Sequence, residues 1–184
     1  DMPRVLIFAG ANGSGKTTFS NSILEPGFVF INADDVKKKK GLSYLEAGKE
    51  SLRLIDMAIS KRMEFSFETT MAGIGLYKRF ERLKKEKYSI TIFYLFAYPI
   101  DLLLERIRER VKKGGHMVSD EDVIRRYYRS AFNFWNKYRF HASEWAIINN
   151  NQLDSESIAV GSNGSFNIMN DLEFSIFKET VSHG

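Results

Sequence analysis

Residues Gly10–Thr17, GANGSGKT, match the pattern G-x-x-x-x-G-K-[ST], and this motif restricts the chain to a small set of folds. The apolar run Val5–Ala9 precedes the motif, and a helical segment from Lys16 to about Leu24 follows it. In this strand–loop–helix context, glycines let backbone N–H groups surround a phosphate, and the helix N-terminus adds partial positive charge. The motif therefore predicts a binding loop for the phosphates of a nucleoside triphosphate.

Short apolar runs alternate with helical patterns along the rest of the chain. Further strands are predicted at about 28–31, 65–69, 90–96 and 145–148, and further helices at about 45–59, 76–83, 101–113 and 119–140. We expect Ser43 and Glu46 to form a capping box, and Asp101 and Ser119 to cap the helices that they precede. Such alternation predicts an α/β fold with a mainly parallel sheet and helices on both faces. Together with the phosphate-loop motif, it predicts the P-loop NTPase and kinase type of this fold.

The whole chain, residues 1–184, is expected to form one domain that ends in a β-hairpin at about 156–170 and a short helix. Asn163-Gly164 is a typical hairpin turn. Hydrophobic residues make up 43% of the chain and charged residues 27%, close to globular averages. The absence of cysteine excludes a thiolate nucleophile and fits a reducing cytoplasm. No apolar run reaches membrane-spanning length, so we expect a cytoplasmic protein with no membrane partner.

The phosphate loop assigns roles to its residues. We expect Lys16 to neutralise the β and γ phosphates of ATP and the Thr17 hydroxyl to ligate Mg²⁺. The full set of expected nucleotide contacts in the loop is Gly10, Ala11, Asn12, Gly13, Ser14, Gly15, Lys16, Thr17 and Thr18. The guanine-reading Asn-Lys-x-Asp of GTPases and the signature sequence of transporter ATPases are both absent, which favours a kinase.

Two acidic positions follow predicted strands at the edge of the sheet where the phosphate loop lies. Asp34 is the candidate base that accepts a proton from the attacking hydroxyl, with Asp35 as the weaker candidate. Glu68 could grip a substrate hydroxyl or orient a metal-bound water. The alternative roles are structural: Asp34 as a helix cap, Asp35 as a solvated charge, and Thr69 or Thr70 as the cap of the next helix.

Arginines flank a glycine-containing loop between two predicted helices. Arg106 and Arg110 share one helical face, and Arg126 and Arg129 share another. We expect the segment at about 106–129 to form a lid whose guanidinium groups bind phosphates, with His116 in its loop as a further nucleotide contact. Arg125 is expected to point about 100° away from Arg126 and to lie outside the clamp. Solvated helix faces are the alternative.

The aromatic residues 132–140 do not predict a nucleic-acid partner. Their spacing is helical, which places most of them in the core, and no RNA- or DNA-binding signature accompanies them. The lysine run 37–40 is expected to be a solvated face. The net charge of +4 is compatible with anionic partners but selects none of them.

In family order, the chain carries five short motifs that resemble those of the zeta toxin-like P-loop kinases. They are Phe8–Phe19 with the phosphate loop, Phe30–Asp34, Phe67–Thr70, Gly114-Gly115-His116-x-Val118 and Arg125-Arg126-Tyr127-x-Arg129-Ser130. The resemblance spans nearly the whole chain. The Asn12-Gly13-Ser14 sequence and the Gly-Gly-His loop are similar to the short chromosomal branch of the family, although Ser119 stands where that branch commonly has proline.

The resemblance implies an ATP- and Mg²⁺-dependent kinase whose acceptor is a small molecule, above all a UDP-amino sugar such as UDP-N-acetylglucosamine. It also implies an antitoxin protein as partner. Under it, Asp34 is the base and also contacts the substrate, Glu68, Thr69 and Thr70 contact the acceptor, and Arg126 and Arg129 clamp the γ-phosphate. The alternatives are a kinase acting on nucleosides, nucleotides or nucleic-acid 5′-hydroxyls, and an ATP-binding regulator that transfers no phosphate.

Overall fold

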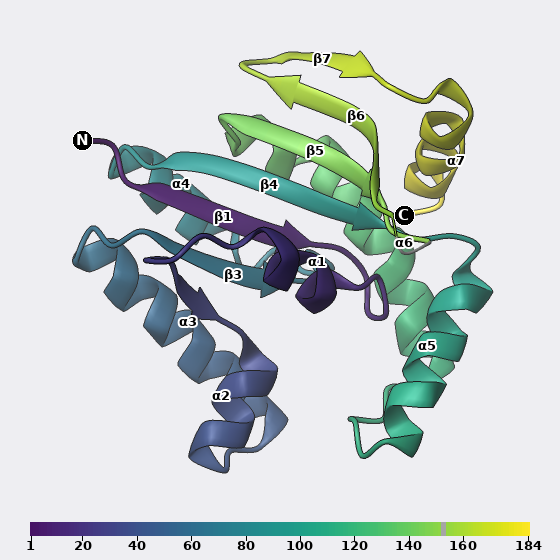
Figure 1. The fold of residues 1–184 in the computed structure, drawn as a ribbon, viewed down its shortest axis with the longest axis horizontal. Helices are drawn as coiled ribbons and strands as arrows, with labels where there is room; N and C mark the ends of the chain where they lie inside the picture. The colour runs from purple at the N-terminus through teal and green to yellow at the C-terminus, as the bar shows by residue number, and fades with distance from the viewer. Residues whose placement is uncertain (152–153) are drawn as a thin grey trace.

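A seven-stranded sheet forms the centre of the computed structural model, which describes residues 1–151 and 154–184. The strands are β1 (Arg4–Ala9), β2 (Val29–Ile31), β3 (Phe65–Thr69), β4 (Ser89–Phe96), β5 (Glu144–Asn149), β6 (Glu156–Ser162) and β7 (Ser165–Ile168). Their order across the sheet is β2-β3-β1-β4-β5-β6-β7 (Figure 1). The first five pair in parallel, and β6 and β7 are antiparallel. The predicted α/β class with a mainly parallel sheet is confirmed.

Strand β1 lies between β3 and β4, and it is buried because its residues form a continuous apolar run. Val5, Ile7 and Phe8 are fully buried, as a continuous apolar run requires when a strand is covered on both faces. This central place puts the end of β1, and the loop that follows it, between the ends of two neighbouring strands.

The helices are α1 (Lys16–Ile23), α2 (Ala33–Lys40), α3 (Tyr44–Ser60), α4 (Tyr77–Lys85), α5 (Ile100–Lys112), α6 (Asp120–Asn136) and α7 (Asp171–Ser182), with a 3₁₀ turn at Tyr138–His141. On one face of the sheet, Phe19 of α1 packs against Phe8 and Phe93. The other face packs against α3, α4, α6 and α7, whose side chains share one core with Phe65 and Phe67. Helices therefore cover both faces, as predicted.

Helix α5 projects away from the sheet (Figure 1), and its contact with α6 has a small core of its own. Leu104, Ile107 and Val123 form that core, separate from the main one. The glycine-containing loop 113–119 joins the two helices, and both also reach the main core, α5 through Leu103 and α6 through Tyr127 and Ala131.

Several local predictions are confirmed and others are wrong. The capping box at Ser43 and Glu46 is present, and Ser119 caps α6. Helix α5 instead begins after Pro99, with Asp101 inside its first turn, and α4 begins after Leu76 rather than at a threonine cap. Helix α2 was not predicted, because its eight residues bury only Val36 and carry no apolar period.

At the C-terminal end, β6 and β7 form the predicted hairpin, and both turn residues, Asn163 and Gly164, have positive φ. The long helix ends at Asn136, four residues earlier than predicted. Within residues 1–151 and 154–184, no helix is both long and apolar enough to cross a membrane.

Candidate functional site

The phosphate loop joins the end of β1 to α1, and two of its positions leave no room for a side chain. Gly13 and Gly15 have φ values of 80° and 85°, a region that only glycine adopts readily. A Cβ on Gly13 would lie 2.9 Å from the Leu103 carbonyl oxygen, and one on Gly15 would clash with the Asn150 side chain. The loop is thus packed from outside by α5 and by the end of β5.

Lys16 is directed back over this loop. Its Nζ donates to the carbonyl oxygens of Gly10 at 2.9 Å and Ala11 at 3.1 Å. Burial lowers the pKa of Lys16 to about 8, although the carboxylate of Glu68 raises it. The buried Ser14 hydroxyl has no hydrogen-bond partner among the described residues. The loop therefore holds donors suited to an anion.

Thr17 and Glu68 meet across the sheet edge, although 51 residues separate them. The Thr17 hydroxyl donates to Glu68 Oε1 at 2.8 Å and Oε2 at 3.1 Å. Asn32 Nδ2 also donates to Glu68. Burial raises the pKa of Glu68. The hydrogen bonds from Thr17 and Asn32 and the positive charge of Lys16 oppose this rise. Oxygen donors from a hydroxyl and a carboxylate are ligands that Mg²⁺ prefers, so this pair fits the metal that the loop implies.

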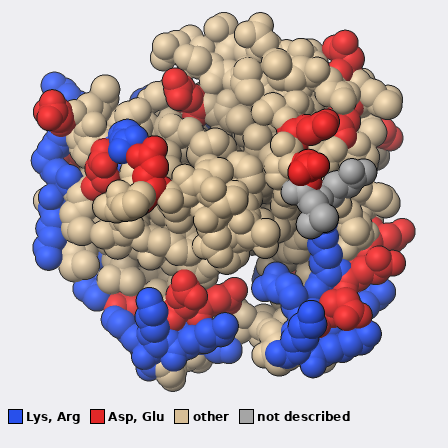
Figure 2. Space-filling view, in the orientation of Figure 1, with Lys and Arg blue, Asp and Glu red and all other residues tan. Residues whose placement is uncertain are grey.

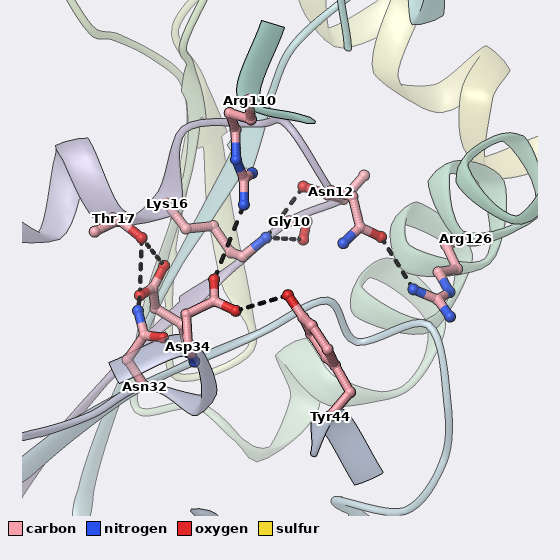
Figure 3. A network of polar contacts seen from close by, with 11 residues as sticks. Gly10, Asn12, Lys16, Thr17, Asn32, Asp34, Tyr44, Arg110 and Arg126 are labelled. Atoms are coloured by element: carbon pink, nitrogen blue, oxygen red, sulfur yellow. Dashed lines mark hydrogen bonds and ion pairs between the residues drawn. The ribbon is translucent and has the colours of Figure 1, made fainter. Parts of the chain in front are cut away.

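Asp34 lies in the first turn of α2, and side chains from α3 and α5 are directed at its carboxylate (Figure 3). The Tyr44 hydroxyl donates to Asp34 Oδ1 at 3.1 Å, and Arg110 Nη2 lies 3.9 Å from Oδ2. The pKa of Tyr44 rises to about 12 through burial and through the Asp34 charge and hydrogen bond. Asn32, not Asp34, caps α2: its Oδ1 accepts from the Asp34 amide at 2.8 Å.

The His116 ring contacts the ring of the same tyrosine. Its ring centroid is 3.7 Å from that of Tyr44, so the loop between α5 and α6 touches the start of α3. Arg110 and His116, both expected to contact nucleotide, thus contact the residues around Asp34. Asp35 is exposed and takes part in none of these contacts.

Two residues that support the phosphate loop were not predicted as such. Arg106 was expected in the lid, but it donates to Gly13 O at 3.2 Å and to the carbonyls of Asn150 and Asn151. Asn150 Nδ2 donates to Ser14 O at 2.7 Å. A single asparagine after a strand carries no sequence signal of this kind.

The arginines of α6 lie on the other side of the loop. Arg126 Nη1 donates to Asn12 Oδ1 at 3.5 Å (Figure 3). Arg125 and Arg129 line one cavity together with Arg126. Arg125 was expected to point away from Arg126, but its side chain, which pairs with Asp122 at 2.7 Å, lines the same cavity. That Arg125 lies outside the phosphate clamp stays a prediction.

The remaining predicted residues have local contacts. Thr69 Oγ1 accepts from the Met71 amide at 3.1 Å, and Thr70 Oγ1 accepts from the Ala72 amide at 3.4 Å, so both shape the loop after β3. Thr18 is exposed on α1. Neither Thr69 nor Thr70 caps a helix.

Charge is distributed unevenly around the site. Figure 2 shows a notch between two projections that correspond to α2 and α5, and Lys and Arg side chains gather on both. Asp and Glu side chains also lie on both projections, so the notch has basic and acidic groups along its two sides.

The comparisons with known proteins agree with the fold. A family model described as AAA domain (AAA_33) matches residues 5–133. An uncharacterized protein of Haemophilus influenzae is 26% identical over 129 residues, which cover 67% of this chain and 92% of that protein.

Two solved structures share the architecture. A chain of the AvrRxo1-ORF1:-ORF2 complex with ATP has a TM-score of 0.76 at 13% identity, covering 98% of this chain and 64% of that one. A chain of the PezAT chromosomal toxin–antitoxin system of Streptococcus pneumoniae has a TM-score of 0.61 at 14% identity, covering 100% and 87%. This chain spans less than two thirds of the first structure's length, and at these identities the likeness is one of fold.

Proposed function

The chain belongs to the AAA_33 family of AAA domains, and from this premise we propose that it is a kinase that transfers the γ-phosphate of ATP to a hydroxyl of a small-molecule acceptor. One observation carries the proposal: two carboxylates, Glu68 at the end of β3 and Asp34 in the first turn of α2 just after the neighbouring strand β2, lie near Lys16 and Thr17. A protein that only binds ATP has no need of a base at this position.

The phosphate loop holds the triphosphate in this proposal. Lys16 exchanges its carbonyl contacts for β- and γ-phosphate oxygens. The Ser14 hydroxyl, which is unpaired among the described residues, binds the remaining oxygens together with the backbone amides of the loop. Thr17 would ligate Mg²⁺, and Glu68 would accept from a metal-bound water. The ion neutralises charge on the phosphates when it is bound.

Asp34 acts as the base. It accepts the proton of the acceptor hydroxyl while that oxygen attacks the γ-phosphorus and ADP leaves. Tyr44 orients the carboxylate through its hydrogen bond, and Asp34 also contacts the acceptor. Glu68, Thr69 and Thr70 are the other candidate acceptor contacts, since they end the adjacent strand.

Arginines neutralise the transferring group. Arg126 is the first candidate because it already contacts the loop at Asn12, and Arg129 lies one turn further along the same face. Arg110 and His116 complete the lid from the side of Asp34. Fork-shaped guanidinium groups suit the spread charge of a phosphoryl group.

The motifs shared with zeta toxin-like kinases favour a UDP-amino sugar, such as UDP-N-acetylglucosamine, as acceptor and an antitoxin protein as partner. The likeness to a chain of the PezAT toxin–antitoxin system is consistent with this choice through its fold.

A transfer assay tests the proposal. The protein is incubated with Mg²⁺ and γ-labelled ATP and a panel of UDP-sugars, nucleosides and oligonucleotides, and labelled product is measured alongside the ATP-induced rise in melting temperature. We expect labelled UDP-sugar, and we expect Lys16→Ala to abolish the thermal shift, which is worth about 2.7 kcal/mol at a hundredfold excess over Kd. ATP binding with no transfer to any acceptor would identify a regulator, and labelled oligonucleotide would identify an end kinase.

A further inference from the structure

The hydroxyl of Tyr44 lies at hydrogen-bond distance from the candidate base, as the hydroxyl of an acceptor must. It donates to Asp34 Oδ1 at 3.1 Å (Figure 3), and a general base has to be within such a distance of the proton that it removes. Of the hydroxyl groups in residues 1–151 and 154–184, that of Tyr44 alone donates to the Asp34 carboxylate. The base therefore already holds a hydroxyl of its own chain.

The other hydroxyl groups near the phosphate loop have different partners. Thr17 donates to Glu68. The Oγ1 atoms of Thr69 and Thr70 accept from backbone amides of the loop after β3. Tyr44 thus differs from these three threonines by being bound to the residue that is proposed to accept the proton.

The position of Tyr44 is fixed by its surroundings. Tyr44 is the first residue of α3, directly after the capping box, in which the Ser43 amide donates to Glu46 Oε2 at 2.8 Å and the Glu46 amide donates to Ser43 Oγ at 3.3 Å. The His116 ring lies 3.7 Å from its ring centroid, and Lys37 Nζ lies 4.4 Å from the same centroid. Contacts from α2, from α3 and from the loop after α5 therefore direct the phenol.

Cationic side chains surround the Tyr44 hydroxyl and its partner. Arg110 Nη2 lies 3.9 Å from Asp34 Oδ2, and Lys16 is close enough for the Asp34 charge to raise its pKa. Lys37 lies against the tyrosine ring. A phosphotyrosine carries a charge of about −1.5 to −2 at pH 7, so these three cations would offset the repulsion between its phosphate and the Asp34 carboxylate.

The phenol needs a base if it is to attack a phosphate. Burial and the neighbouring Asp34 charge raise the pKa of Tyr44 to about 12, so the hydroxyl keeps its proton at neutral pH. Tyr77 on α4 provides a comparison, because it is 39% exposed, close to the 38% of Tyr44. Its hydroxyl donates to no carboxylate in the described part of the chain, so accessibility alone does not distinguish the two tyrosines.

We propose that Tyr44 is an autophosphorylation site and that its phosphate closes the acceptor site. This inference rests on the proposed kinase function. Asp34 accepts the proton of the Tyr44 hydroxyl while the phenolic oxygen forms a bond to the γ-phosphorus of ATP. The bond between that phosphorus and the β–γ bridging oxygen breaks, and ADP leaves with the electron pair. The phosphate on Tyr44 then covers Asp34, so transfer to other acceptors stops.

Mass spectrometry tests the modification. The full chain is incubated with Mg²⁺ and ATP and no added acceptor, and its intact mass and the modified peptide are measured. We expect a gain of one phosphoryl group per chain, located on Tyr44. Tyr44→Phe and Lys16→Ala should abolish the gain, and Asp34→Asn should slow it by about 100-fold or more, the scale of general-base loss. Tyr77→Phe is the matched control and should be modified as the wild type is.

A mixing experiment tests whether the reaction takes place within one chain. The tyrosine and the base belong to the same chain, so the rate constant should not depend on protein concentration. In a mixture of wild type and Lys16→Ala, which differ in mass, only the wild type should gain phosphate. Modification of the Lys16→Ala chain would show transfer between chains and would overturn the assignment of Tyr44 to its own site.

The effect on transfer separates this inference from the kinase function. Preincubation with ATP should lower transfer to an external acceptor at least tenfold, and phosphatase treatment should restore it. Tyr44→Phe should keep its own starting rate after the same preincubation. Transfer to an acceptor with Tyr44 unmodified, or with phosphate on other residues only, refutes the site and leaves the kinase standing. Modified Tyr44 with undiminished transfer refutes the closure. Neither modification nor transfer refutes the kinase, and the site with it.

Discussion

Two groups of polar residues near the phosphate loop, an acid wall and an arginine wall, differ in how completely their members are paired. The acid wall, which comprises Asn32, Asp34, Tyr44 and Glu68, is joined by hydrogen bonds among its members and to Thr17. The arginine wall comprises Arg110, Arg125, Arg126 and Arg129. Among residues 1–151 and 154–184 it has one close carboxylate partner, Asp122, and one distant one, Asp34 at 3.9 Å. The acid wall is already assembled, whereas the arginine wall still has unused hydrogen-bonding capacity.

The supporting structure explains the difference. Glu68 and Asn32 sit at strand ends, where the ladder of β2, β3 and β1 fixes their backbone. The arginines project from helices, and the α5–α6 contact has only a small core. A proton-accepting group must be placed accurately, while long guanidinium side chains can adjust to a bound phosphate.

Activity should be more sensitive to substitutions in the acid wall, and we expect the largest effect from Asp34→Asn. Removing the base while keeping its shape should lower kcat by about 100-fold or more, the scale of general-base loss, with ATP affinity unchanged. Steady-state kinetics and ATP titration measure both quantities. Asp35→Asn, at an exposed neighbour, serves as control, and a slow Asp35 variant with a normal Asp34 variant would reverse the assignment.

On the arginine wall, Arg126→Ala should raise the barrier for kcat/KM by about 2–4 kcal/mol, as loss of a charge-stabilising donor does. The effect should fall on kcat more than on the KM for ATP, because the contact strengthens as charge spreads in the transition state. Arg108→Ala, which removes an exposed ion pair on α5, is the control. Equally small changes in kcat/KM for Arg126→Ala and Arg108→Ala would show that α6 has only a structural role.

Lys16 lies between the two walls, and its ionisation should make ATP binding pH-dependent. Its pKa in the free protein is lowered to about 8, so above that pH the amine is neutral and must take up a proton to bind phosphate. The Kd for Mg²⁺-ATP should therefore rise by up to about tenfold per pH unit above 8. Calorimetry between pH 7 and 9.5 measures the trend. Lys16→Arg keeps its charge and should flatten it; a flat wild-type profile would contradict the shift.

The smallest effect is expected at Tyr44. Tyr44→Phe removes one hydrogen bond to Asp34, worth about 0.5–1.5 kcal/mol, so kcat should fall by no more than about tenfold. The KM for ATP should not change. Tyr77→Phe, on α4, is the matched control. A loss as large as that of Asp34→Asn would mean that Tyr44 itself takes part in the proton transfer.

The sequence by itself determined the features that depend on neighbouring residues. The phosphate loop, the buried strands, the caps at Ser43 and Ser119 and the Asn163-Gly164 turn are local, because a few consecutive residues fix their backbone. Helix α2 could not be predicted from the sequence, because its lysine run has no periodic apolar residues and an asparagine such as Asn32 is equally common in turns.

Tertiary structure alone decided which distant side chains meet. Glu68 contacts Thr17 because β3 lies between β2 and β1, a strand order that apolar runs do not specify. The same packing places Arg106 against the phosphate loop, where it donates to Gly13 O, and brings Arg125 to the cavity that Arg126 and Arg129 also line. Partners far apart in sequence are set by how elements stack, and long side chains can reach beyond the direction in which their helix presents them.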